Sequence, residues 1–124
     1  MNRRLFLLAL ALPACSVSAG TAPPGRKAVA HTVIIEGMQF TPATLEIHPG
    51  DSVTWVNKDI VEHTATAAAS ARQPFDSGSI AAGKSWKRTF TKEGKYAYVC
   101  TYHPTMKGAI EVTSVKPARR TRRA

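Results

Sequence analysis

Three residues that could bind a soft metal ion lie close together near the C-terminal end of the sequence. In the stretch YAYVCTYHPTMKGAIEV, residues 96–112, a thiol at Cys100, an imidazole at His103 and a thioether at Met106 follow one another at intervals of three residues. Copper sites for electron transfer use two histidines, one thiolate and a weak axial thioether. The stretch therefore supplies three of the four ligands of such a site.

A histidine from elsewhere in the chain must complete the set. His63 is the best candidate, because it follows the strand-like segment SVTWVN, residues 52–57, and stands at the start of an irregular stretch. His31 and His48 lie in or beside other strand segments, and we predict that they are surface residues and not ligands. The predicted ligands of one copper ion are His63, Cys100, His103 and Met106.

Two other uses of the thiol are weaker. Zinc accepts one cysteine and two histidines, but a closed zinc site needs a fourth strong ligand, and a thioether is not one. A disulfide between Cys15 and Cys100 would require Cys15 to stay in the mature protein, and it would leave His103 and Met106 without a role. A single cysteine in an oxidising compartment needs a reason, and copper ligation supplies it.

The chain begins like an exported protein. Residues 1–19 have a basic start at Arg3 and Arg4, a short apolar run and a small-residue cleavage site, which is the layout of a secretory signal peptide. We expect export to the periplasm by the Sec or the twin-arginine route. Cleavage with lipid attachment at Cys15 ranks second to plain cleavage. Residues 20–30 are predicted to be a linker, 31–115 the domain and 116–124 a basic tail.

The net charge of +9 is concentrated at the two ends of the chain. The signal and the linker carry two basic residues each and the tail carries five, so residues 28–115 have no net charge. A neutral body with basic ends is not a nucleic-acid-binding surface. The tail is predicted to be solvated, with weak contact to an anionic membrane or a partner as the alternative.

Short strands punctuated by turns account for the rest of the domain. Strand patterns lie in HTVIIEG, TLEIHPGD, SVTWVN, KSWKRTF, YAYVC and AIEVTS, and no sustained helical period follows the signal. Such spacing predicts an all-β antiparallel sandwich or barrel. Residues 58–84 are the least strand-like and contain His63, and a long excursion of this kind is usually functional.

These motifs resemble the cupredoxins, the type 1 blue copper proteins, in their amicyanin-like form. MQFTPATLEIHPGDSVTWVNKDIVEHT is similar to the family's first-histidine region, and FTKEGKYAYVCTYHPTMKGAIEV is similar to its ligand loop with the short Cys-x2-His-x2-Met spacing. The resemblance runs from about Thr32 to Thr113. It implies a Greek-key β-sandwich with one copper at one end, bound by the four residues above. It also implies a carrier of single electrons between redox proteins. Because His103 is on a loop and not on a strand, we expect a monomer that meets its partners through a transient surface around His103.

Two positions depart from the family pattern. Thr64 stands where the family commonly has an asparagine that ties the two ligand loops together, and a hydroxyl can still donate and accept a hydrogen bond. Tyr102 stands where the amicyanin loop has proline, so it restores a backbone N–H, which we expect to point at the Cys100 sulfur.

Two rival functions come from other classes. A periplasmic copper chaperone or store would favour methionine- and histidine-rich tracts, but of the three methionines only Met106 has ligand spacing. An enzyme would need a nucleophile, an acid–base pair or an open metal position, and the sequence offers none that we can identify. We therefore expect an electron carrier that is not an enzyme.

Overall fold

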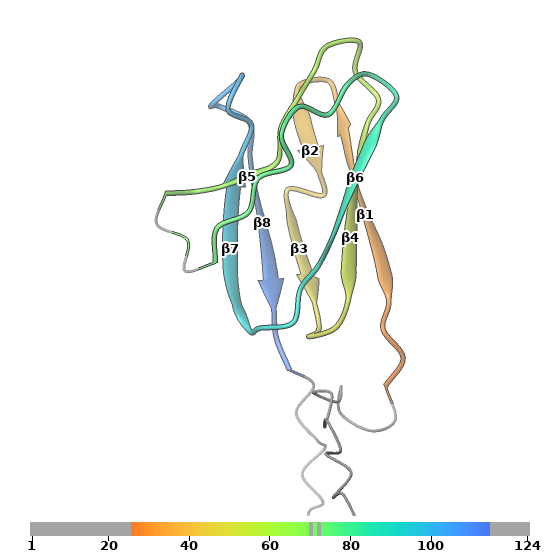
Figure 1. Cartoon of the computed structure of the whole chain (residues 1–124), viewed down its shortest axis with the longest axis vertical. Helices are drawn as coiled ribbons and strands as arrows, with labels where there is room; N and C mark the ends of the chain where they lie inside the picture. The colour runs from red at the N-terminus through yellow and green to blue at the C-terminus, as the bar shows by residue number, and fades with distance from the viewer. Residues whose placement is uncertain (1–25, 70, 72, 115–124) are drawn as a thin grey trace, which may run out of the picture.

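Eight β-strands in two sheets make up the regular structure of residues 26–69, 71 and 73–114, which the computed structural model describes (Figure 1). The strands are β1 (Ala30–Glu36), β2 (Gln39–Thr41), β3 (Thr44–Ile47), β4 (Ser52–Asn57), β5 (Thr66–Ala67), β6 (Ser85–Thr89), β7 (Gly94–Val99) and β8 (Lys107–Val112). No helix of the described residues is long and apolar enough to cross a membrane. The predicted signal peptide, Cys15 and the basic tail lie outside the described residues.

The two sheets are mixed and not purely antiparallel. One sheet has the order β2-β1-β4-β6 and the other β3-β8-β7-β5. The pairs β1–β4 and β3–β8 are parallel, which corrects the antiparallel expectation. β2 runs antiparallel to β1, and the chain then crosses to the other sheet without reversing, so β3 runs in the same direction as β2 (Figure 1). The turn after β3 reverses the chain and returns it to the first sheet, where β4 is therefore parallel to β1. The all-β sandwich itself is confirmed.

Alternation of side chains explains the strands that the sequence predicts. In β4 the side chains of Val53, Trp55 and Asn57 are buried and their neighbours are half-buried. Along β6 and just beyond it, Trp86 and Arg88 are half-buried and Phe90 is buried. β2 and β5 were not predicted, because two or three residues are too few to show a period of two.

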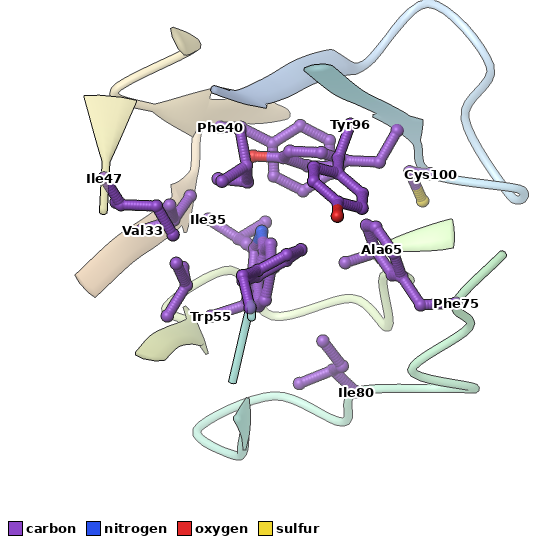
Figure 2. Close-up of a cluster of buried hydrophobic side chains, with 14 of the residues drawn as sticks. Val33, Ile35, Phe40, Ile47, Trp55, Ala65, Phe75, Ile80, Tyr96 and Cys100 are labelled. Atoms are coloured by element: carbon purple, nitrogen blue, oxygen red, sulfur yellow. The ribbon is translucent and has the colours of Figure 1, made fainter. Parts of the chain in front are cut away.

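The core lies between the sheets and reaches the predicted ligands. Trp55 and Tyr98, from opposite sheets, pack edge to face with ring centroids 5.4 Å apart, an arrangement that aromatic pairs prefer. Cys100 is fully buried and lies at an edge of this cluster beside Ala65 (Figure 2). The thiol is therefore held by the same packing that holds the two sheets together.

The loops divide between the two ends of the sandwich. One end, which we call the ligand pole, carries the β1–β2 turn at Gly37 and Met38, residues 58–65 and the loop 100–106 (Figure 1). The other end, the far pole, carries the β3–β4 turn at residues 48–51 and the first and last described residues (Figure 1).

Candidate metal centre

The loop between β7 and β8 brings three of the predicted ligands together. The N–H of Met106 donates to the carbonyl of His103 at 2.9 Å, and the N–H of Cys100 donates to the carbonyl of Met106 at 3.1 Å. These bonds close a tight turn at the end of the sheet. Cys100 and Met106 are buried, whereas His103 is half-buried. Of the three predicted ligands in this loop, His103 is therefore the one within reach of the surface.

His63 reaches the same place from the irregular stretch of residues 58–84. Its backbone exchanges two hydrogen bonds with Ile80, at 3.2 and 2.7 Å, which form an isolated antiparallel bridge. The side chain of His63 is completely buried. The excursion that lacks strand character is thus the element that positions the predicted histidine.

The donor atoms of the predicted ligands in the two loops converge. Cys100 Sγ lies 3.7 Å from His63 Nδ1 and 3.8 Å from His103 Nδ1, and these three atoms all lie within 4.8 Å of one another. Metal–nitrogen and metal–sulfur bonds of about 2.0 and 2.3 Å, opened by about 120°, span about 3.7 Å. The three side chains therefore fit around one ion, and Met106 is buried in the same loop.

A carboxylate lies against the outer ring nitrogen of His63. Asp59 Oδ2 lies 2.8 Å from His63 Nε2, so Nε2–H donates to the carboxylate and Nδ1 faces the thiol with its lone pair. The backbone N–H of Met38, followed by that of Gly37 and by His63, lowers the pKa of Asp59 and so favours the carboxylate form. The sequence analysis did not identify Asp59. Its one signal is a position four residues before the candidate histidine, which is weak by itself.

Thr64 ties the two ligand loops together, as its position in the family pattern leads us to expect. Its Oγ1 accepts a hydrogen bond from the Thr101 N–H at 2.9 Å and lies 3.1 Å from Thr101 Oγ1. Its backbone N–H donates to Cys100 Sγ at 3.4 Å. Among the described residues, the backbone N–H that bonds to the Cys100 sulfur is thus that of Thr64. The expectation that the Tyr102 N–H points at this sulfur is wrong. The side chain of Tyr102 is exposed on the outside of the loop.

The other two histidines lie at the far pole, away from the ligands. His31 Nε2 contacts Asp51 Oδ2 at 3.0 Å, and His48 Nδ1 donates to the carbonyl of Thr113 at 2.6 Å. Both are half-buried and both use a ring nitrogen within the fold. They were predicted to be surface residues outside the site, and they do lie apart from the cluster at the ligand pole.

Several known proteins are similar in sequence to this chain. Residues 27–113 match the copper-binding proteins of the plastocyanin/azurin family. Amicyanin of Paracoccus denitrificans is 31% identical over 82 residues, which cover 64% of this chain and 63% of that protein. Amicyanin-alpha of Methylorubrum extorquens is 28% identical over 117 residues, which cover 88% of this chain and 98% of that protein.

Solved structures show the same fold. The Cu(I) form of a methionine-to-alanine variant of amicyanin superposes with a TM-score of 0.63 at 29% identity, covering 68% of this chain and 82% of that chain. A copper-containing nitrite reductase from Thermus scotoductus gives a TM-score of 0.66 at 32% identity, covering 82% of this chain but 25% of that chain. The chain belongs to the copper-binding plastocyanin/azurin family and is an amicyanin-like cupredoxin.

Proposed function

We propose that the protein is a periplasmic carrier of single electrons whose copper ion is held by His63, Cys100, His103 and Met106. The observation that carries the proposal is the convergence of a buried thiol and two imidazole Nδ1 atoms, with Sγ to Nδ1 distances of 3.7 and 3.8 Å. When bound, copper would supply a one-electron change between Cu(II) and Cu(I). The chain holds the ligand atoms close to the spacing that such an ion needs, so little has to move when the electron arrives.

His103 is the proposed exit for the electron, because it is the half-buried member of an otherwise buried set. Exposed apolar side chains lie on the loops of the same pole: Ile60 is 95% exposed, and Met38, Val61 and Tyr102 are between 41 and 52% exposed. A small apolar rim favours the brief encounters of electron-transfer partners, which bury little area. We therefore place the transient contact with donor and acceptor proteins there, on a monomer.

The rival functions explain fewer of these observations. Of the three methionines in the sequence only Met106 has ligand spacing, whereas a copper store would favour methionine-rich tracts. Nitrite reduction belongs to the Thermus enzyme by name, but this chain matches a quarter of that protein. Among the described residues, one cluster of histidine, cysteine and acidic side chains could hold an ion, and two of its three members are fully buried. Such a site offers a small molecule little access.

The test of the proposed function follows the electron and the metal separately. Purified mature protein is loaded with Cu(II), its visible spectrum is recorded, and the reduced form is mixed with an oxidised cupredoxin or with an apo copper acceptor. We expect intense sulfur-to-copper absorption, rapid electron exchange and full retention of copper after separation. Stoichiometric loss of copper to the acceptor would favour a chaperone, and absence of the absorption would refute the site.

The proposed location has its own test. A fusion of residues 1–30 to a reporter that is active only after export should be active in the periplasmic fraction. Replacing Arg3 and Arg4 by lysine distinguishes the routes, because the twin-arginine route depends on that pair and the Sec route tolerates the change. A reporter retained in the cytoplasm would contradict the periplasmic proposal.

A further inference from the structure

We propose that Asp59 is a positioning residue of the copper site: its carboxylate joins the His63 imidazole to the β1–β2 turn and so holds His63 Nδ1 toward Cys100. The proposal rests on the proposed function, because it assigns a role toward the same copper ion. It concerns a residue that touches neither the ion nor a partner and that acts through His63.

Both oxygens of the carboxylate are engaged. Oδ2 lies 2.8 Å from His63 Nε2 and accepts the N–H of Met38 at 3.0 Å, and Oδ1 accepts the N–H of Gly37 at 2.7 Å. The Asp59 side chain is 15% exposed and that of His63 is fully buried. Three donors from two segments therefore fix the carboxylate at the rim of the site, with the imidazole beneath it.

The β1–β2 turn has the backbone shape that this contact requires. Gly37 and Met38 have φ angles of 62° and 58°, both in the left-handed region. Two successive left-handed residues form the tight hairpin turn that joins antiparallel strands, and here their two N–H groups bond the same carboxylate. Met38 has a side chain and is disfavoured in this conformation, which persists where the surroundings over-determine it. The bonds to Asp59 are such surroundings.

Asp59 is also fixed from its own side. Its N–H donates to Asn57 Oδ1 at 3.0 Å, and the buried Asn57 amide donates to the carbonyls of Val61 and Ile80 at 2.8 Å each. Ile80 is the residue that pairs with the backbone of His63. The carboxylate and the imidazole are thus mounted on one hydrogen-bonded frame, so the distance between them is set by the fold.

The chemical consequence concerns the two nitrogens of His63. A carboxylate that accepts the Nε2 proton selects the tautomer with a free lone pair on Nδ1 and makes the imidazole a stronger donor to a metal ion. Its negative charge also favours Cu(II) over Cu(I), which lowers the reduction potential. Loss of such a partner typically reduces metal affinity by about 10–100-fold.

The chain offers a matched control for this charge. Glu62 lies next to His63 in the sequence, is exposed, and accepts a hydrogen bond from Ser79 Oγ at 2.8 Å. Glu62→Gln removes the same charge as Asp59→Asn without touching the imidazole. Both variants and the wild type are compared for Co(II) affinity of the apo protein, for reduction potential with copper bound, and for visible and electron paramagnetic resonance spectra.

We expect Asp59→Asn to weaken Co(II) binding at least tenfold and to raise the reduction potential by about 59 mV, which is a tenfold change in the Cu(I)/Cu(II) preference. Glu62→Gln should leave the Co(II) affinity within twofold of the wild type. Equal effects of the two substitutions would overturn the proposal, since only the loss of charge would then matter.

A measurement on the unaltered protein covers the case in which Asp59→Asn does not fold. Long-range proton–nitrogen NMR of the apo wild type reports which ring nitrogen of His63 carries the proton. Protonated Nε2 and bare Nδ1 support the role of Asp59, and a proton on Nδ1 refutes it. This readout needs no copper, so a failure of the proposed function, seen as no blue absorption, is distinguishable from a failure of this inference.

Discussion

The sandwich carries a histidine–carboxylate pair at each pole, and the two pairs are built in opposite ways. At the ligand pole His63 Nε2 meets Asp59 at 2.8 Å, with the histidine fully buried and the carboxylate at the rim. At the far pole His31 Nε2 meets Asp51 at 3.0 Å, with the carboxylate fully buried and the histidine at the rim. At the ligand pole the buried member is the histidine, whose second ring nitrogen faces Cys100. At the far pole the buried member is the carboxylate, whose oxygens face donors of the protein.

At the far pole every bonding direction of the buried group is used within the protein. Asp51 accepts two bonds from the Arg26 guanidinium, at 2.9 and 3.0 Å, and one each from the N–H groups of Val29 and His48. Burial alone would raise the pKa of Asp51, but these bonds and His31 outweigh it and hold that pKa well below its usual range. Groups of the protein therefore occupy the acceptor positions of this carboxylate, and none is left for a ligand.

At the ligand pole two buried groups and one half-buried group are left facing one another. Cys100 Sγ and the Nδ1 atoms of His63 and His103 converge on one point. Buried polar groups normally find partners within the protein, so the centre on which this set converges is the position that we propose for the copper ion. A buried charged pair is thus not by itself an indication of a functional site, whereas donor atoms that converge on one point are.

The largest expected effect is on the visible absorption of the copper-loaded protein, which should depend on the ligand pole and not on the far pole. Cys100→Ser should abolish the sulfur-to-copper absorption completely, because a hydroxyl does not replace a thiolate as a copper ligand. His31→Ala and His48→Ala, which alter far-pole histidines, should leave the spectrum of the copper-loaded protein unchanged. Retention of the absorption in Cys100→Ser, or its loss in either alanine variant, would refute the assignment of the copper ligands to the ligand pole alone.

A change in the far-pole carboxylate should act on stability and not on copper. Asp51→Asn removes a charged acceptor from several buried donors, which should cost about 1–3 kcal/mol in the free energy of unfolding at neutral pH. Because the pKa of Asp51 is lower in the folded protein, its stabilising contribution is present above the unfolded pKa and is lost as the pH falls through the folded pKa. In denaturant titrations the stability difference between wild type and variant should therefore be constant near neutral pH and shrink steadily as the pH falls from about 4 toward 2.

Glu111→Gln serves as the control for that titration. Its carboxylate is 39% exposed and lies 3.9 Å from Lys95 Nζ, and exposed pairs of this kind contribute about 0–1 kcal/mol. We expect an unfolding free energy close to that of the wild type and a parallel pH profile. If the two variants behaved alike, the far-pole pair would be no more than a surface contact.

The smallest expected effect is on stability, and it concerns the hydrogen bonds that join the two loops of the ligand pole. Thr64→Val removes the hydroxyl that bonds Thr101 but keeps the N–H that donates to Cys100 Sγ, so the blue colour should remain while stability falls by about 1 kcal/mol. Thr113→Val, which removes an exposed hydroxyl bonded to Glu46, should change stability by less than about 0.5 kcal/mol. A colourless Thr64→Val protein would show that the hydroxyl also sets the ligand geometry.

The sequence predicted those features that depend on spacing within one segment. The loop from Cys100 to Met106 and the buried alternation of β4 are local patterns, and both are present in the structure. The parallel pairing of β1 with β4 was not predictable in this way, because it depends on where the chain changes sheets. Asp59 escaped detection for a related reason, since its contacts with Gly37 and Met38 cross 22 and 21 residues.

The far pole has a consequence for how the domain can be joined to other molecules. The chain enters beside Asp51 through Arg26 and leaves beside His48 through Thr113, so both ends reach one turn. Domains whose ends lie close together tolerate insertion into longer chains. A tether, a fusion partner or an electrode linker attached at either end would present the copper outward and leave its loops untouched. The attachment points and the proposed copper site thus lie at opposite poles of the domain.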